Sequence, residues 1–135
     1  MIMIRMLSIL FALVVLSGCA ALPQSIGTCV EPQRVRSVNI TYQQQINMVK
    51  VQVAPHRVEA NSGDLIRFKI NGTLGKLVSV KGKATDPDAA WIVGNATAGS
   101  FYVCVPMIAE PTQLFSYEVD VDGIGFLDPE VRVRR

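Results

Sequence analysis

The feature that most constrains this sequence is a series of short runs, rich in β-branched and aromatic residues, which turn-forming residues interrupt. Such runs favour strands because branched and aromatic side chains pack well on a pleated surface. After Pro32 no window of eleven residues has an apolar stripe at helical spacing. Residues 84–90 can hold one helical turn at most. The expected strands are 35–42, 48–53, 65–70, 76–80, 91–93, 100–105, 114–121 and 130–133.

The clearest strand lies near the end of the chain. In residues 114–122, apolar and polar side chains alternate from Phe115 onward, which is typical of a strand with one face in a core and the other in water. Asp122-Gly123 then predicts a hairpin turn. Short strands at this spacing predict an antiparallel β-sandwich. The side chains expected in its core are Phe115, Tyr117, Val119 and Val121.

The N-terminal segment has a different pattern. One basic residue, Arg5, precedes an apolar run of about eleven residues, which suits a secretory signal and is too short to span a bilayer. The run ends in Leu16-Ser17-Gly18-Cys19. This ending resembles the lipobox of bacterial lipoproteins, in which the cysteine receives the lipid.

The lipoprotein resemblance implies a division of the chain and a location. Residues 1–18 would be a signal peptide, residues 19–32 a lipidated N-terminus and tether, and residues 33–135 a β-sandwich domain. Acyl chains such as palmitate on Cys19 would hold the protein on the membrane. Ala20, where inner-membrane retention often uses aspartate, favours the outer membrane, with the domain facing the periplasm.

Two stretches of the mature chain resemble the cupredoxin fold. In the first, Gly63-Asp64 precedes an alternating strand that ends at Asn71. The second, residues 98–106, places Cys104 where that family has its copper thiolate. The resemblance implies a cupredoxin-like sandwich, and an immunoglobulin-like sandwich is the alternative with similar strand spacing.

A blue-copper site needs two imidazoles and a thiolate, usually with a weak axial thioether. The chain has one histidine, His56, and it precedes the Gly63-Asp64 turn. The segment after Asn71, where the family has its first copper histidine, contains no histidine. After Cys104, Met107 is the only histidine, cysteine or methionine that could bind copper. We therefore expect no metal and no other cofactor.

The chain has three cysteines, and export to an oxidising compartment would account for all of them. If Cys19 carries lipid, Cys29 and Cys104 are an even pair in an exported chain, and such a pair favours a disulfide. Two free thiols or a metal pair are the alternatives.

No catalytic motif is present, so we expect that the protein is not an enzyme. Thirteen basic and eleven acidic residues give no electrostatic footprint for nucleic acid. The favoured function is a non-catalytic binding or assembly module, anchored to the membrane through Cys19, with an envelope protein as partner. One alternative is periplasmic copper handling through Met48, His56, Met107 or free thiols. Another is a glycan-binding domain built on Trp91 and its neighbours, although Trp91, Phe101, Tyr102, Phe115 and Tyr117 are expected mainly in the core.

Overall fold

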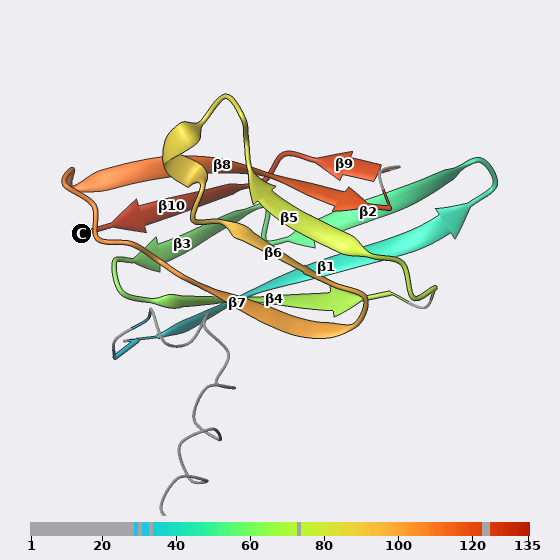
Figure 1. Ribbon diagram of the computed structural model, residues 1–135, viewed down its shortest axis with the longest axis horizontal. Coiled ribbons are helices and arrows are strands. Elements are labelled where there is room, and N and C mark those ends of the chain that lie inside the picture. The colour runs from blue at the N-terminus through green and yellow to red at the C-terminus, as the bar shows by residue number, and fades with distance from the viewer. Residues whose placement is uncertain (1–28, 30, 33, 73, 123–124) are drawn as a thin grey trace, which may run out of the picture.

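The computed structural model describes residues 29, 31–32, 34–72, 74–122 and 125–135. The expected signal segment and Cys19 lie outside these residues. The described chain forms two facing sheets with a β1–β2 hairpin extending at one end and the C-terminus at the other (Figure 1). The elements are β1 (Val35–Gln45), β2 (Met48–Ala54), β3 (Arg57–Asn61), β4 (Leu65–Asn71), β5 (Val78–Gly82), the single-turn helix η2 (Pro87–Ala89), β6 (Val93–Ala96), β7 (Gly99–Cys104), β8 (Thr112–Val121), β9 (Gly125–Leu127) and β10 (Glu130–Arg134).

The two sheets are called the β4 sheet and the β8 sheet, after the strand with the most buried residues in each. The β4 sheet has the order β2-β1-β4-β7, and the β8 sheet has the order β3-β10-β8-β5-β6, with β9 paired to β8. Strands β1 and β4 are parallel, as are β10 and β3, and the other described pairs are antiparallel. The β3 strand joins the opposite sheet, so β4 returns beside β1 in the same direction.

The expected all-β sandwich is confirmed, with one correction to its pairing. The sheets are mixed rather than wholly antiparallel, because each contains one parallel pair. The immunoglobulin-like alternative has two antiparallel sheets. Of the two folds expected from the sequence, the structure therefore supports the cupredoxin-like sandwich.

Two strands were not expected from the sequence. In β3, only Val58 and Ala60 are buried, and breakers flank this short stretch on both sides. The β9 strand has three residues and pairs with the end of β8, and Gly123 of the expected turn lies outside the described residues. Elsewhere the expected strands are present with shifts of up to three residues at their ends, and the expected helical turn is η2.

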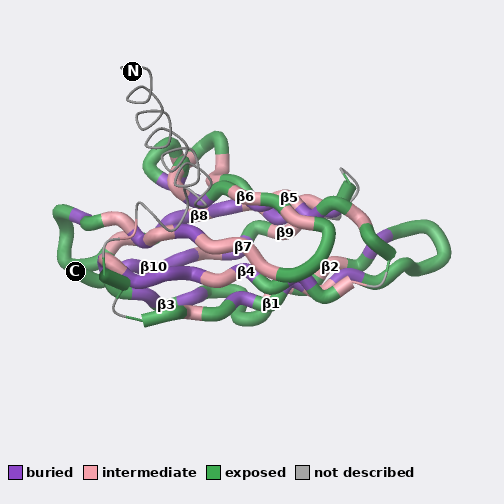
Figure 2. The backbone as a smooth tube through the Cα atoms, turned by 60° about the horizontal axis from the view of Figure 1, so that its bottom comes forward, coloured by how far each residue is buried: buried purple, intermediate pink, exposed green. Residues whose placement is uncertain are grey.

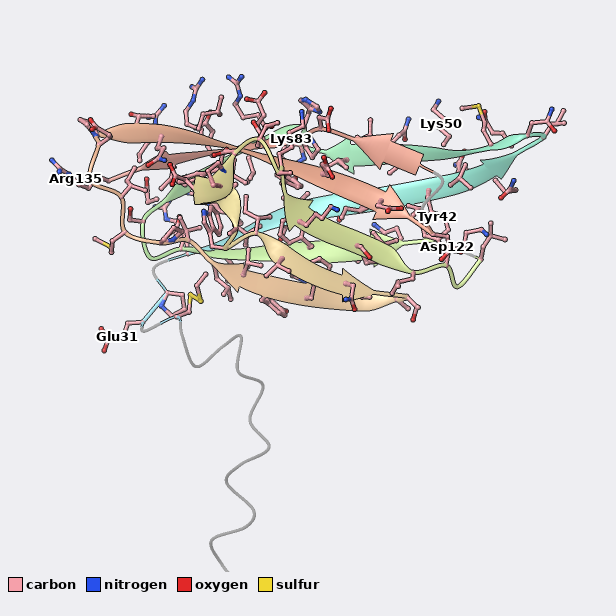
Figure 3. All side chains as sticks on the ribbon, turned by 45° about the horizontal axis from the view of Figure 1, so that its top comes forward. Glu31, Tyr42, Lys50, Lys83, Asp122 and Arg135 are labelled. Carbon is pink, nitrogen blue, oxygen red and sulfur yellow. A yellow bond between two sulfur atoms is a disulfide. The ribbon has the colours of Figure 1, made fainter. Side chains whose placement is uncertain are left out.

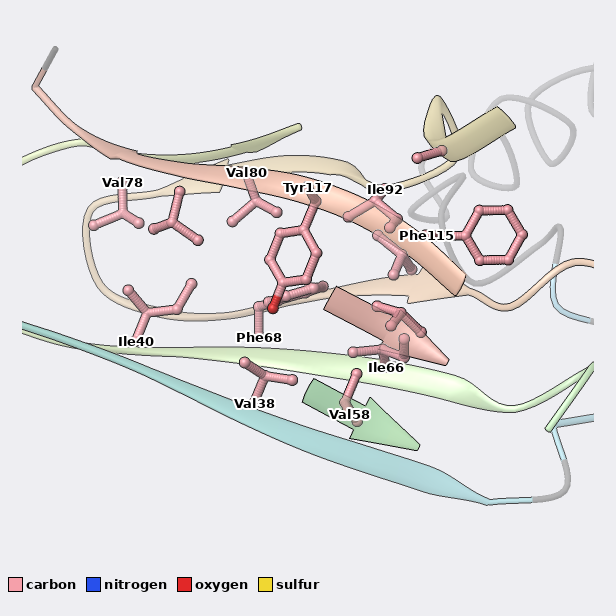
Figure 4. Close-up of a cluster of buried hydrophobic side chains, with 14 of the residues drawn as sticks. Val38, Ile40, Val58, Ile66, Phe68, Val78, Val80, Ile92, Phe115 and Tyr117 are labelled. Carbon is pink, nitrogen blue, oxygen red and sulfur yellow. The ribbon is translucent and has the colours of Figure 1, made fainter. Parts of the chain in front are cut away.

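The core lies between the two sheets, and buried residues alternate with less buried ones along several of the strands that line it (Figure 2). The expected register of the long C-terminal strand is confirmed, because Phe115, Tyr117, Val119 and Val121 are at most 2% exposed. Tyr117 projects from β8 towards Phe68 on β4, and their ring centroids are 5.7 Å apart (Figure 4). Every buried apolar residue of the described chain lies between positions 38 and 133. The sandwich therefore has a complete core without the tether.

The Tyr117 hydroxyl leads to a prediction about alkaline stability. It is buried without a hydrogen-bond partner in the described part of the chain, and burial raises the pKa of its phenol above the ordinary value of 10.0. The folded state therefore keeps this proton above pH 10 while the unfolded state loses it, so stability falls as the pH rises, by up to about 1.4 kcal/mol per unit from this group.

We expect Tyr117→Phe to change the free energy of unfolding by about 1 kcal/mol or less at pH 7, because no hydrogen bond is lost. Above pH 10 the variant should lose less stability than the wild type. Urea unfolding at pH 7 and pH 11 measures both effects. Parallel losses in the two proteins would contradict the burial of the phenol.

Candidate functional site

The expected Cys29–Cys104 disulfide is present, with Cα atoms 5.3 Å apart. Cys104 is the last residue of β7 and is opposite Leu65 of β4. Both side chains are on the outer side of the β4 sheet, because Ile66 and Val103, the next pair along, face the core. The tether therefore joins the domain on the outer side of the β4 sheet.

A buried carboxylate lies beside this attachment point. Asp64 is in the turn between β3 and β4 and is completely buried. Its Oδ2 accepts a hydrogen bond from the Asn61 backbone N–H at 2.8 Å and pairs with the Arg36 Nε at 3.3 Å. Its Oδ1 has no partner within the described residues, nor has the nearby Ser62 hydroxyl.

The contacts of Asp64 with Asn61, Arg36 and Val105 hold the fold together. The Asp64 backbone carbonyl also accepts a hydrogen bond from the Val105 N–H at 2.9 Å, so the turn holds β3, β4 and the segment after β7 together. The sequence identified the Gly63-Asp64 turn but not Arg36, which is 28 positions earlier in the chain. Only the parallel pairing of β1 with β4 brings the two charges together.

The residues present do not fit the copper centre that the cupredoxin resemblance would imply. The sulfur of Cys104 is bonded to Cys29, so its thiolate cannot be a ligand. His56 is exposed in the turn between β2 and β3, and Met107 is 77% exposed in the loop after β7. Met48 is at the far end of β2 from His56, about 20 Å away by strand rise. No group of three or more His, Cys, Asp or Glu able to hold a metal occurs in the described ranges.

The aromatic residues considered for glycan binding are mostly in the core, as expected. Phe115 and Tyr117 are buried, Trp91 meets Phe115 edge-to-face at 5.2 Å, and Phe101 stacks on Phe68 at 5.1 Å. Tyr102 alone faces outward, because its neighbours Phe101 and Val103 face the core. These five side chains therefore form no common platform.

A shallow groove is present near the β1–β2 hairpin. Its lining contains no acidic, basic, histidine or cysteine side chain, and consists of Thr41, Tyr42, Gln43, Asn71 and Gly72. The Tyr42 ring lies so close to Gly72 that a Cβ there would overlap it, and the Tyr42 hydroxyl accepts a hydrogen bond from the Lys76 backbone N–H at 3.0 Å. The groove offers amide and hydroxyl groups for binding but no pair of groups for acid–base chemistry.

The two sheets differ sharply in charge. The strands of the β8 sheet carry four basic and four acidic residues, and ion pairs link Arg57 with Glu130, Arg132 with Glu59 and Lys81 with Glu118. The strands of the β4 sheet carry four basic residues and no acidic residue. The basic residues of the β4 sheet are Arg36, Lys50, Arg67 and Lys69.

No protein-family model and no curated protein matches the chain. Several solved structures are similar in fold. The McoA multicopper oxidase from Aquifex aeolicus is 13% identical with a TM-score of 0.42, and the match covers 75% of this chain but only 30% of the oxidase. Auracyanin B is 11% identical over 78% of this chain and 92% of its own, with a TM-score of 0.41. Rusticyanin from Thiobacillus ferrooxidans is 13% identical over 85% and 95%, with a TM-score of 0.39. At these values neither the copper nor the activity of those proteins extends to this chain.

Proposed function

We propose that the chain is a lipid-anchored envelope protein whose β-sandwich acts as a non-catalytic binding or assembly module. The observation that carries the proposal is the use of cysteines. The chain has three, and Cys29 and Cys104 are bonded to each other. Cys19 is thus the remaining cysteine, whose thiol could receive a lipid, and it ends the lipobox-like sequence Leu16-Ser17-Gly18-Cys19.

The chemistry of the domain supports a binding role. Its histidine is exposed in a turn, two of its thiols form a disulfide, and the buried carboxylate of Asp64 is paired with Arg36. No helix in the described ranges is both long and apolar enough to cross a bilayer. Membrane attachment would then come from acyl chains on Cys19, which contribute about 0.8 kcal/mol for each buried methylene. The expected place is the periplasmic side of the outer membrane, where the sandwich would meet an envelope partner.

Cell fractionation tests the anchor. We expect Cys19→Ser to leave the membrane fraction, or to accumulate as uncut precursor, because serine offers no thiol for the lipid. The matched control is Cys29→Ser, which removes another cysteine of the N-terminal segment and should remain membrane-bound. Membrane-bound Cys19→Ser at the mature mass would refute the proposal.

A further inference from the structure

We infer that the outer face of the β4 sheet is a docking surface for anionic lipid headgroups, so that the anchored domain lies with this face towards its own membrane. The inference builds on the proposed lipid anchor and adds the orientation of the domain. Two independent observations carry it, namely the charge of this face and the place where the tether leaves the domain.

The first observation is the composition of the face. Its outward side chains are hydroxyls, amides and three cations beside the exposed apolar Val35 and Met48, and they belong to strands without any aspartate or glutamate. Arg67 donates a hydrogen bond from its Nε to the Ser100 hydroxyl at 3.1 Å, which holds the guanidinium on the face. Lys69 and Lys50 are exposed. The polar and charged part of the face consists of Ser37, Asn39, Thr41, Gln43, Gln45, Lys50, Gln52, Arg67, Lys69, Asn71, Ser100 and Tyr102.

The opposite face of the sandwich provides the contrast. On the β8 sheet, carboxylates balance the basic side chains in number, and most of them form cross-strand pairs. A surface of this kind has little net attraction for an anionic membrane. The β4 sheet instead combines exposed cations, with no carboxylate on its strands, with groups that can donate hydrogen bonds to phosphate oxygens.

The second observation is the position of the tether. The disulfide attaches Cys29 to the outer side of the β4 sheet. Cys19 and Cys29 are ten positions apart, so the lipidated residue can be at most about 35 Å from the attachment point. The lipid anchor is therefore attached to the same side of the domain that carries the exposed cations.

The remaining charges at this end are nearly balanced. Glu31 is exposed at the end where the tether joins the domain, far from Lys50 (Figure 3). Arg34, three positions later in the chain, is exposed as well, and Arg36 is paired with Asp64. Arg67 and Lys69, at the middle of the β4 sheet, are thus the cations that we expect to contribute most to docking. Each basic side chain near an anionic surface favours docking about fivefold.

The test measures the reactivity of lysines on a tethered domain. A chain that begins at Ala20, with a hexahistidine tag in place of the lipid, is attached to vesicles through a nickel-chelating lipid. Its sandwich retains the complete core. A water-soluble acylating reagent then modifies exposed amines on vesicles of phosphatidylglycerol or phosphatidylcholine. Because the tag replaces the lipid, the result does not depend on whether Cys19 is lipidated.

We expect Lys69 to react several-fold more slowly on phosphatidylglycerol than on phosphatidylcholine, whereas Lys81 on the β8 sheet should react equally on both. High salt should remove the difference, because it screens exposed charges. Arg67→Gln should reduce the protection of Lys69, with a docking constant lower by about fivefold. Arg132→Gln, the same change on the β8 sheet, should leave it unchanged.

Three results would overturn the inference. Equal protection of Lys69 and Lys81 would show a general effect of the charged surface. Equal rates for Lys69 on both lipids would show that the face does not dock. Protection of Lys69 by free glycerol phosphate, together with equal rates on both lipids in its absence, would mean that the face binds soluble phosphate instead of the membrane.

Discussion

Replacing both Cys29 and Cys104 by serine should lower the free energy of unfolding by about 4 kcal/mol. The bond joins residues 75 positions apart, so its removal releases a long loop in the unfolded chain. The loss is a large part of the stability of a domain of this size. Urea unfolding of the oxidised wild type and the double variant measures it.

The wild-type protein treated with a reductant is the control for this change, since it loses the bond without losing either thiol. It should unfold at nearly the same urea concentration as the double variant. The dependence on urea should also become steeper without the bond, because the unfolded chain exposes more surface. A loss of less than about 1 kcal/mol in both would mean that the Cys29 segment adds little constraint to the unfolded chain.

The disulfide also sets the length of the tether. The bond fixes the chain at Cys29. The next backbone hydrogen bond that the described residues show is that of the Arg34 carbonyl, which accepts from the Leu65 N–H at 2.8 Å. The disulfide therefore attaches the tether to the β4 sheet five positions nearer to Cys19 than that hydrogen bond does. A single covalent link thus affects both the stability of the domain and the side that it can turn towards the membrane.

The sequence predicted the parts of the fold that depend on local alternation. The β8 register followed from the alternation of apolar and polar residues that begins at Phe115, and a slip of one residue would have placed Glu118 and Asp120 in the core. The β3 strand was missed because its two buried residues, Val58 and Ala60, are too few to form a pattern. Its place comes from parallel pairing with β10, which is more than 70 positions away.

The candidate sites show the same division between local and long-range information. The Cys29–Cys104 bond followed from counting cysteines, because the exported chain offered one pair. The pairing of Arg36 with Asp64 could not be foreseen, since it depends on the parallel register of β1 and β4. The charge difference between the two faces could not be predicted from the sequence either. The net charge is nearly balanced, and the strands of the two sheets are interleaved along the chain.

Phe68→Ala is the substitution in the core for which we expect the largest cost. Phe68 is completely buried at the centre of β4, where its ring stacks on Phe101 of the same sheet and meets the edge of Tyr117 from the other sheet. Alanine would remove the contact that joins the two layers and leave a cavity between them. The free energy of unfolding should fall by about 3–5 kcal/mol.

Lys69→Ala is the matched control, because Lys69 is the next residue on the same strand and is exposed on the outer face. It should change the free energy of unfolding by about 0.5 kcal/mol or less. Urea unfolding of the two variants at the same pH gives the comparison. Similar small effects for both would show that β4 does not present Phe68 to the core. Because the register of β4 also decides which way Arg67 and Lys69 point, that result would remove the cationic face as well.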